Sequence, residues 1–213
     1  KNMRGIFFEE LDSSPPSVNL AVGSGPHGQQ TGRIMERLEE WLLEGEDFDG
    51  VLVYGDTNST LAGALVAAKL QLPLIHVEAG LRSFNREMPE EINRTVVDRI
   101  SAILCCPTVE AVRQLEEEGI RDRVHHTGDV MRDAARMFAP APGDVDVLLS
   151  FGGFDPGEYY LATVHRAENS DNPERLTAIL GALGRLERPV VMPLHPRTRD
   201  RLEGRALPRN VRV

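Results

Sequence analysis

Ionisable side chains gather in one stretch of the sequence, residues 51–94, at positions where they could transfer protons. Asp56 and Glu78 each end a short apolar run, and Glu90 and Arg94 open a segment with a helical pattern. In an open parallel sheet, residues at the carboxyl ends of strands face the ligand crevice, so these carboxylates would lie where a substrate binds. Clustered carboxylates raise one another's pKa and can then serve as acids and bases near neutral pH. The pattern indicates an enzyme.

Each of these charged residues also has a purely structural interpretation. Asp56 could cap the helix that follows it, and Glu78 could be a strand-end residue without a chemical role. Glu90 and Arg94 are four residues apart on a helix, where they could form a surface ion pair. The cost of burying an unpaired carboxylate favours the chemical interpretation of Glu78. Glu91 points to another side of the helix and is predicted to be structural.

The elements that must position these residues follow a regular order. Short β-branched runs alternate with longer helical segments, which is typical of βαβ units around a parallel sheet. Thr108 and Gly119 stand at the two ends of one predicted helix, and Asn172 caps another. The sequence predicts strands at 51–54, 74–77, 102–105, 124–127, 159–164 and 190–193, and helices at 30–44, 59–70, 90–99, 109–118, from 131 and from 172.

Residues 139–157 hold three prolines and four glycines in 19 positions, and we interpret them as a connection between two domains. The expected fold class is α/β, with two Rossmann-like domains built on parallel sheets. The first domain spans 1–145 and is expected to lack its first strands, because no apolar strand pattern opens the chain. The second spans 158–213 and has fewer strands than a Rossmann-like half needs, so both domains are expected to be incomplete.

The composition of the chain argues against some kinds of binding partner and indicates a cellular location. A formal charge of −9 and an isoelectric point near 5.2 argue against nucleic acid and anionic membranes as the main partner. No apolar run of the sequence approaches the roughly 18 residues of a membrane span, and no signal-peptide pattern is present. Cys105 and Cys106 are adjacent and are expected to stay reduced, packed as small apolar residues. These features predict a soluble, cytoplasmic protein.

Three further features contain residue types that often bind ligands or metals. His165 and Arg166 follow the first predicted strand of the second domain, at the end that faces a ligand crevice. His125 and His126 point to opposite faces of a strand and have no second cluster at metal-ligand spacing, so we predict a structural role and no metal site. The glycine-rich segment 23–33 precedes a helix but matches no phosphate-binding pattern, which favours a flexible loop.

Six motifs occur together in the order that is typical of one family. They are GDTNST (55–60), HVEAGLRS (76–83), MPEEINR (88–94), GDV (128–130), TVHRAEN (163–169) and PLHPRTR (193–199). The sequence resembles the non-hydrolysing UDP-N-acetylglucosamine 2-epimerases, including the subgroup that acts on a UDP-2,3-diacetamido-uronate. This resemblance implies two Rossmann-like domains of the GT-B type, a UDP-sugar substrate in a cleft between them, a homodimer and no cofactor.

The resemblance also implies a reaction and the residues that perform it. Inversion at C2 of the sugar proceeds by loss of UDP, formation of a 2-acetamidoglucal, and return of UDP with a proton on the opposite face. Asp56, Glu78 and Glu90 match the acidic catalytic positions of the family, two as proton carriers and one in an electrostatic role. His165 matches the position that contacts the pyrophosphate or assists the departure of UDP.

Six further residues are inferred from the resemblance to bind the substrate: Arg94, Arg166, Glu168, Asn169, His195 and Arg197. Glu168 and Asn169 could instead shape a loop or cap the next helix. His195 and Arg197 could instead bind an allosteric ligand.

Several alternatives stay open on the sequence alone. The sugar could be a 2,3-diacetamido-uronate, whose additional carboxylate would need a cation such as Arg82 or Arg86. A hydrolysing epimerase would release the free sugar and UDP. A glycosyltransferase of similar fold would not need three carboxylates around C1 and C2. Outside enzymes, the alternative is a fragment that binds a nucleotide sugar without catalysis.

Overall fold

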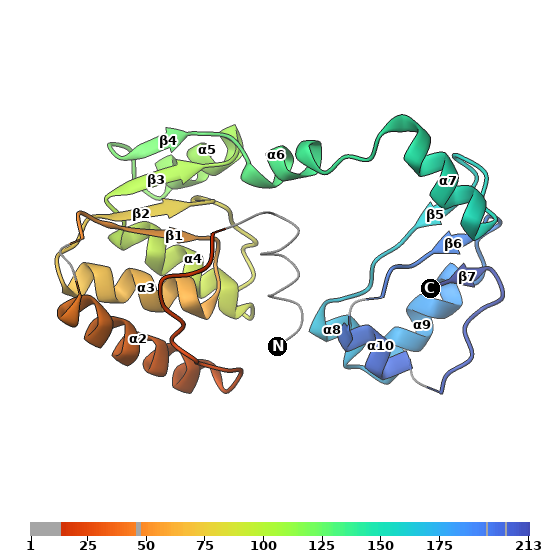
Figure 1. Ribbon diagram of the computed structural model, residues 1–213, viewed down its shortest axis with the longest axis horizontal. Coiled ribbons are helices and arrows are strands. Elements are labelled where there is room, and N and C mark those ends of the chain that lie inside the picture. Colours follow the sequence, from red (N-terminus) through yellow and green to blue (C-terminus); the bar gives the residue numbers. More distant parts are fainter. Residues whose placement is uncertain (1–13, 46–47, 195, 203) are drawn as a thin grey trace. The chain divides into compact units, whose positions relative to one another are not determined.

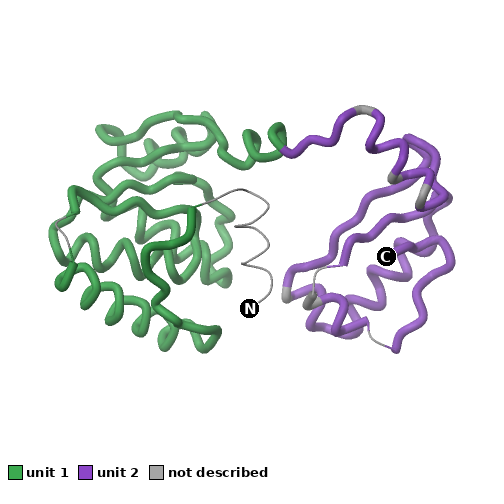
Figure 2. The backbone as a smooth tube through the Cα atoms, in the orientation of Figure 1, with its two compact units in different colours: residues 1–137 green, residues 138–213 purple. Residues whose placement is uncertain are grey.

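The computed structural model describes residues 14–45, 48–194, 196–202 and 204–213. The chain divides into two compact units, and the division falls between Met137 and Phe138 (Figure 2). Each unit is an α/β structure with a parallel sheet, so the predicted fold class is confirmed. The sequence placed the end of the first domain at residue 145 and the start of the second at 158, whereas the contacts assign the segment 138–157 to the second unit.

The sheet of the first unit contains four parallel strands in the order β1-β2-β3-β4 (Figure 1). Each strand lies next to its predecessor because a helix connects the two. The strands β1 to β4 span Val51–Tyr54, Leu74–Val77, Ile103–Cys106 and Val124–His126, and the connecting helices are α3 (Asn58–Lys69), α4 (Pro89–Ile100) and α5 (Val109–Glu117). Helix α2 (His27–Glu44) precedes this series and α6 (Val130–Met137) follows it.

Helix α3 is buried on several sides in the first unit. It packs against β1 and β2, and also against the helices α2 and α4. Ala62, Ala64 and Ala67 are completely buried, and such small side chains let the neighbouring elements approach closely. At Gly63, a Cβ atom would lie 3.3 Å from a side-chain carbon of Val53 in β1. This close packing fixes the position of β1, whose carboxyl end leads to the first of the predicted catalytic residues.

A second apolar cluster joins β3 to α5. Leu104, Ala111 and Leu115 are completely buried in it. Thr108 accepts a hydrogen bond from Ala111 N at the start of α5, and Gly119, at φ +80°, follows the end of the helix. Both helix ends therefore agree with the residues that the sequence analysis chose for them.

The two cysteines are free thiols, as predicted. Cys106 is completely buried, and burial, followed by the nearby charge of Asp98, raises the pKa of its thiol to about 12. The thiol therefore stays neutral, and Cys106 packs as a small apolar residue.

The second unit has a sheet of three parallel strands in the order β5-β6-β7. These strands span Tyr160–Leu161, Val190–Val191 and Val211–Arg212, and the helices of the unit are α7 (Pro142–Gly152), α8 (Ala167–Ser170), α9 (Pro173–Leu183) and α10 (Pro196–Leu202). Leu176 and Leu180 of α9 pack in one apolar cluster with Val190 and Met192. Asn172 caps α9 by accepting hydrogen bonds from two backbone N–H groups, as predicted.

Three segments differ from the prediction. The stretch 139–157 contains α7, because Pro142 suits the first turn of a helix and Gly153, at φ +70°, suits its end. Strand β5 ends at Leu161, whereas the sequence predicts a strand that continues to residue 164. Just beyond the strand, Ala162 N still donates a backbone hydrogen bond to Val191 O of β6. Helix α2 begins at His27, so much of the segment predicted as a flexible loop is helical.

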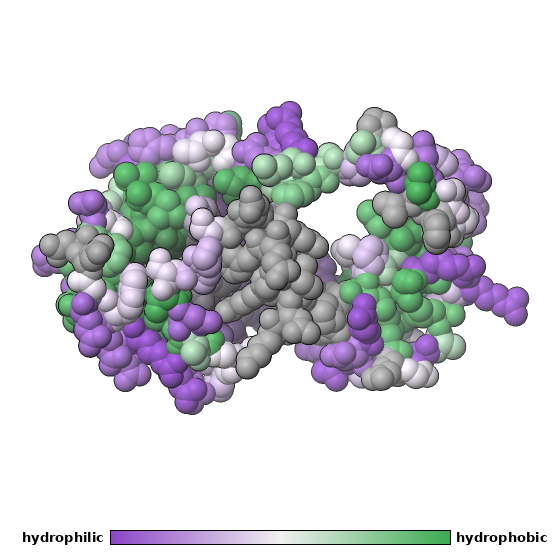
Figure 3. Space-filling view, in the orientation of Figure 1, coloured by the Kyte–Doolittle hydropathy of each residue, from purple (hydrophilic) through white to green (hydrophobic). Residues whose placement is uncertain are grey.

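Apolar side chains are exposed on one face of the first sheet. Val53 packs toward α3, so Leu52 and Tyr54 on the same strand point to the opposite face, where they are 47% and 62% exposed. Figure 3 shows apolar surface over the sheet of this unit. Within the part of the chain that the structure describes, no helix combines the length and apolar character needed to cross a membrane.

The packing of β3 generates a stability prediction. Leu104→Ala removes a completely buried side chain and should lower the free energy of unfolding by about 2–5 kcal/mol. Ile103→Ala, the control in the same strand, removes a side chain that is 39% exposed and should cost much less. Urea unfolding followed by the fluorescence of Trp41, the single tryptophan, reports on the first unit. Equal losses in the two variants would contradict the packing.

Candidate active site

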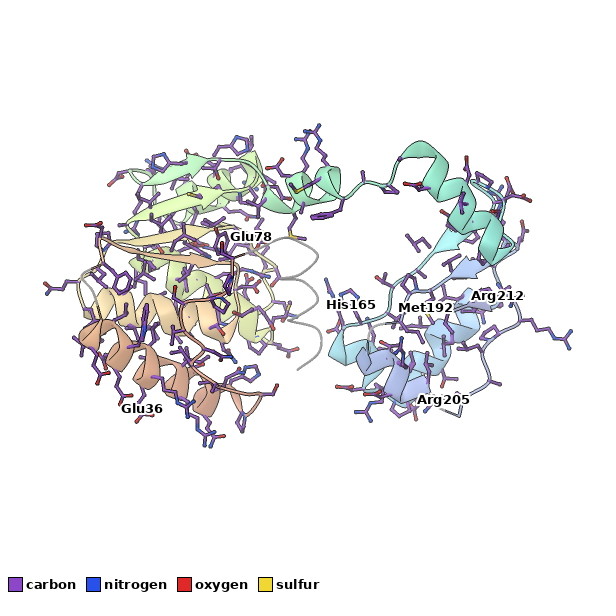
Figure 4. The ribbon with its side chains drawn as sticks, viewed as in Figure 1. Glu36, Glu78, His165, Met192, Arg205 and Arg212 are labelled. Carbon is purple, nitrogen blue, oxygen red and sulfur yellow. The ribbon has the colours of Figure 1, made fainter. Side chains whose placement is uncertain are left out.

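Two further carboxylates, those of Asp56 and Asp129, lie near Glu78 at the carboxyl end of the first sheet. Asp56 follows β1, Glu78 follows β2 and Asp129 follows β4. A Cβ atom on Gly55 would lie 3.2 Å from Glu78 Oε2, so the turns after β1 and β2 touch. The negative charges of Asp56 and Asp129 both act on Glu78. Figure 4 shows Glu78 at this end of the sheet. Asp129, although part of the GDV motif, is missing from the predicted site.

Arg94 of α4 joins this group of carboxylates. Its Nε and Nη2 atoms donate hydrogen bonds to Asp56 Oδ2 at 2.9 and 2.6 Å, and its Nη1 donates to Glu91 Oε2 at 2.8 Å. Asn93 Nδ2 donates to the backbone carbonyl of Asp56 at 2.8 Å. Helix α4 therefore holds both the side chain and the backbone of Asp56.

Two structural alternatives from the sequence analysis are wrong. Helix α3 is capped by Thr57, whose hydroxyl accepts a hydrogen bond from Thr60 N, and not by Asp56. Among the ion pairs of the described residues, Arg94 is joined to Asp56 and Glu91 and not to Glu90. Glu90 itself lies half-buried in the first turn of α4. The i and i+4 spacing predicted the helix correctly, and the Glu90–Arg94 ion pair that it allowed as an alternative is not among the ion pairs of the described residues.

Glu91 does not point away from Arg94, as the sequence analysis expected, but bonds to it and to the loop after β2. Its oxygens accept hydrogen bonds from Ser83 N, Ser83 Oγ and Phe84 N, each at 2.9 Å, in addition to the bond from Arg94. Burial favours its neutral form, but these hydrogen bonds outweigh burial and hold the pKa of Glu91 below its usual value. Glu91 therefore ties the start of α4 to the loop that follows β2.

Glu78 has a strained backbone and a perturbed carboxyl group. Its φ is +73°, a left-handed value that costs energy in any residue with a side chain, and its N–H and that of Ala79 both donate to Cys105 O at 3.1 Å. Burial, and then the charges of Asp56 and Asp129, raise the pKa of Glu78, although nearby positive charges oppose the shift. Both properties are common at catalytic positions.

A buried ionic network lies directly behind these turns. His76 Nδ1 contacts Asp98 Oδ1 at 2.7 Å, and Arg82 donates to Asp98 at 2.7 Å and to both oxygens of Glu118 at 2.7 and 2.9 Å. The side chain of Arg82 is only 3% exposed, so its guanidinium is not available to a substrate carboxylate. Of the two arginines proposed for that purpose, Arg86 is the exposed one. A histidine within the otherwise apolar run LIHV was the signal that could have revealed this network.

Four of the predicted residues of the second unit lie in one continuous stretch, residues 165–169. His165 and Arg166 are exposed and lie between β5 and α8, and Figure 4 shows His165 in this segment. Glu168 and Asn169 belong to α8 itself and do not cap α9, which is capped by Asn172. His195 lies outside the described residues.

The remaining predicted position, Arg197, belongs to α10 by its backbone, while its side chain lies outside the described part of the chain. Among the described residues, no group of three or more histidine, cysteine, aspartate or glutamate side chains could hold a metal ion.

Comparison with known proteins decides the family. A family model described as UDP-N-acetylglucosamine 2-epimerase matches residues 1–213, which is the whole chain. The chain belongs to this family. The resemblance inferred from the six motifs is confirmed, and the two parallel α/β units are of the GT-B type.

Individual relatives agree with this assignment. The UDP-2,3-diacetamido-2,3-dideoxy-D-glucuronate 2-epimerase of Pseudomonas aeruginosa is 49% identical over 100% of this chain, and the UDP-N-acetylglucosamine 2-epimerase of Methanocaldococcus jannaschii is 44% identical over 95%. A crystal structure of UDP-GlcNAc 2-epimerase from Methanocaldococcus jannaschii, in complex with UDP-GlcNAc and UDP, superposes on 93% of this chain with a TM-score of 0.80 and 43% identity. The chain spans 60%, 57% and 56% of these three relatives, respectively.

The turn after β1 generates a first prediction for this site. Gly55→Ala should destabilise the first unit by about 1–2 kcal/mol, because Gly55 has a φ of +63°. The substitution should also displace the Glu78 carboxyl group, because the new Cβ atom would lie 3.2 Å from Glu78 Oε2. Gly119→Ala is the matched control, with φ +80° but open space around the new Cβ atom. Urea unfolding and carboxyl ¹³C spectra measure the two effects. A shifted Glu78 signal in the control as well would contradict the contact.

The raised pKa of Glu78 generates a second prediction. Folding favours the neutral carboxyl, so the protein loses stability as the pH rises from about 4.5 through the folded-state pKa of Glu78. Glu78→Gln removes this loss, and its stability relative to the parent protein should increase between pH 4 and pH 7.5. Urea unfolding at several pH values measures the difference. Glu87→Gln, which removes an exposed carboxyl, is the control, and the same pH dependence in both variants would contradict the assignment.

Proposed function

We propose that this protein epimerises C2 of a UDP-N-acetylhexosamine, converting UDP-GlcNAc to UDP-ManNAc by elimination and re-addition of UDP. One observation carries the proposal: Glu78, with a raised pKa and a strained backbone, lies against the turn that carries Asp56. The family to which the chain belongs supports the same reaction.

The reaction needs groups that move one proton and stabilise separated charges. The bond between C1 and the UDP oxygen breaks, and its electron pair leaves with UDP. The proton on C2 passes to a carboxylate as the C1–C2 double bond forms. Re-addition reverses these steps and delivers a proton to the other face of C2. Carboxylates on both sides of the sugar satisfy the proton transfers and stabilise the oxocarbenium-like centre at C1.

The environments of the carboxylates suggest separate roles. Glu78 is the carboxyl best suited to carry a proton, because burial, and then the charges of Asp56 and Asp129, raise its pKa and favour its neutral form. Asp56 receives two hydrogen bonds from Arg94 on one oxygen, which suits a carboxylate that orients the sugar and stabilises positive charge. We assign the proton transfer on the opposite face to Glu90, which is half-buried in the first turn of α4.

We assign binding of the nucleotide part to the second unit. His165 and Arg166 are exposed at the carboxyl end of β5, a position where parallel sheets bind anionic ligands. His165 would contact the pyrophosphate and assist its departure. Glu168, Asn169 and the pair His195 and Arg197 complete the proposed binding set.

We also propose that the protein acts as a homodimer in the cytoplasm, without a cofactor, in the synthesis of a cell-surface polysaccharide. Family membership supports these points, since a nucleotide-sugar epimerase supplies activated sugars for such polymers. Light scattering after size-exclusion chromatography would test the dimer directly.

Incubation with UDP-GlcNAc in deuterated water tests the reaction. NMR should show UDP-ManNAc with deuterium at C2. Glu78→Gln and Asp56→Asn should each slow this exchange by about 10²–10⁴-fold, as expected for loss of acid–base or electrostatic assistance, while UDP binding is retained. Glu87→Gln, an exposed carboxyl, is the control and should keep the parent rate. Exchange that persists in Glu78→Gln would refute its role as a proton carrier.

A second substrate has specific support. The relative from Pseudomonas aeruginosa that is 49% identical acts, by its name, on UDP-2,3-diacetamido-2,3-dideoxy-D-glucuronate. The extra carboxylate of that sugar would need a cation, and Arg86 is exposed for this purpose. Exchange with this substrate and none with UDP-GlcNAc would favour the second candidate. Exchange with neither, in a chain that binds UDP, would favour a nucleotide-sugar binding fragment.

A further inference from the structure

A row of hydrogen-bonded polar groups, partly exposed at Glu118 and completely buried at Asp98 and His76, connects the end of α5 to the turn after β1. Glu118 accepts hydrogen bonds from Arg82 at 2.7 and 2.9 Å, and Arg82 donates to Asp98 at 2.7 Å. Asp98 lies 2.7 Å from His76 Nδ1, and His76 Nε2 lies 2.8 Å from the carbonyl oxygen of Gly55. The side chains of His76 and Asp98 are completely buried.

Both ring nitrogens of His76 face atoms that accept hydrogen bonds. The Gly55 carbonyl has no proton to donate, and Asp98 also accepts from Arg82 and, at 3.2 Å, from Gly80 N, contacts that suit a carboxylate. A neutral imidazole carries one N–H, so one of its nitrogens would present a lone pair to an oxygen. The imidazolium carries two N–H groups and satisfies both contacts.

The charges in the row lead to the same conclusion. Glu118, whose side chain is 28% exposed, and the completely buried Asp98 contribute two negative charges and both bind Arg82, so with a neutral His76 the buried carboxylate of Asp98 shares one cation with Glu118. A charged His76 gives Asp98 a second, buried cation and makes the row neutral, which lowers the cost of burying that carboxylate. The titratable Cys106 also faces Asp98, and its thiol stays neutral.

We propose that His76 is a buried imidazolium that positions the turns carrying Asp56 and Glu78. The claim that these turns are catalytic rests on the proposed function, whereas the charge of the ring does not. Through Nε2, His76 holds the carbonyl of the residue immediately before Asp56. Through Asp98, it is joined to Gly80 N, two residues after Glu78. His76 is therefore a positioning residue and does not touch the substrate.

The charge of His76 has a second effect on the site. The positive ring opposes Asp56 and Asp129, which favour the neutral form of Glu78, so it moderates the rise in the pKa of that carboxyl. Because the ring is completely buried, solvent screens this effect weakly. The same side chain thus sets the geometry of one carboxylate and the proton affinity of another.

Ring ¹⁵N spectra of histidine-labelled parent protein test the charge directly. Of the six histidines, the His76 signals are identified by their loss in His76→Gln. At pH 7 both ring nitrogens of His76 should carry protons that exchange slowly with water. A single protonated nitrogen would establish a neutral ring and overturn the proposal. If His76→Gln does not fold, Asp98→Asn, which should remove one of the two ring protons, identifies the same signals, and the parent spectrum decides the question.

The effect on the site is measured by titrating the Glu78 carboxyl with ¹³C NMR. His76→Gln keeps a donor toward the Gly55 carbonyl but removes the positive charge, so the pKa of Glu78 should shift upward. His125→Gln, an exposed histidine on β4, is the matched control and should leave that titration in place. An unchanged Glu78 titration in His76→Gln would overturn the electrostatic part of the proposal.

Neither measurement depends on turnover, so the two proposals fail separately. Absence of deuterium exchange with both UDP-sugars would refute the proposed function and leave the charge of His76 measurable. A neutral His76 in a protein that still exchanges the C2 proton would refute the charged ring, and with it this inference, and leave the proposed function standing.

Discussion

The arrangement at the carboxyl end of the first sheet depends on two charged residues of α4 that lie one turn apart. Arg94 binds Asp56 after β1, and Asp98 binds His76 of β2 together with Arg82 and the backbone of Gly80. A buried charge needs partners of opposite sign, and here those partners come from segments that neighbouring strands deliver to the same edge. The helix therefore fixes the turns that carry the carboxylates as well as covering the sheet.

The carboxylate cluster stores free energy that the rest of the unit must offset. The backbone of Glu78 is in the left-handed region, which costs energy. Its carboxyl group is partly buried near the negative charges of Asp56 and Asp129, and both conditions disfavour its ionised form. The packing around α3, with its completely buried alanines, and the ion pairs of α4 hold the turns in place against this cost. A carboxyl whose pKa is raised by such surroundings is suited to proton transfer.

Much of this could be predicted from the sequence, because the information was local. The strands and helices between residues 51 and 126 lie within one residue of their predicted bounds, since apolar periodicity, Thr108 and Gly119 act over short stretches of chain. The prediction for 139–157 is less accurate: its prolines and glycines predict a connection between domains, whereas Pro142 and Gly153 begin and end α7. The same residue types mark both a loop and the ends of a helix.

The sequence by itself determined the parallel α/β class, the family motifs, and the placement of Asp56 and Glu78 at strand ends. Only the tertiary structure decided the partners of these residues. Arg94 binds Asp56, 38 positions away, instead of Glu90 on its own helix, and His76 binds Asp98 across 22 positions. Asp129 joined the cluster because β4 ends at the same edge of the sheet as β1 and β2. Periodicity and capping describe what a residue does within its own segment, while charge pairing depends on which segments the packed sheet brings together.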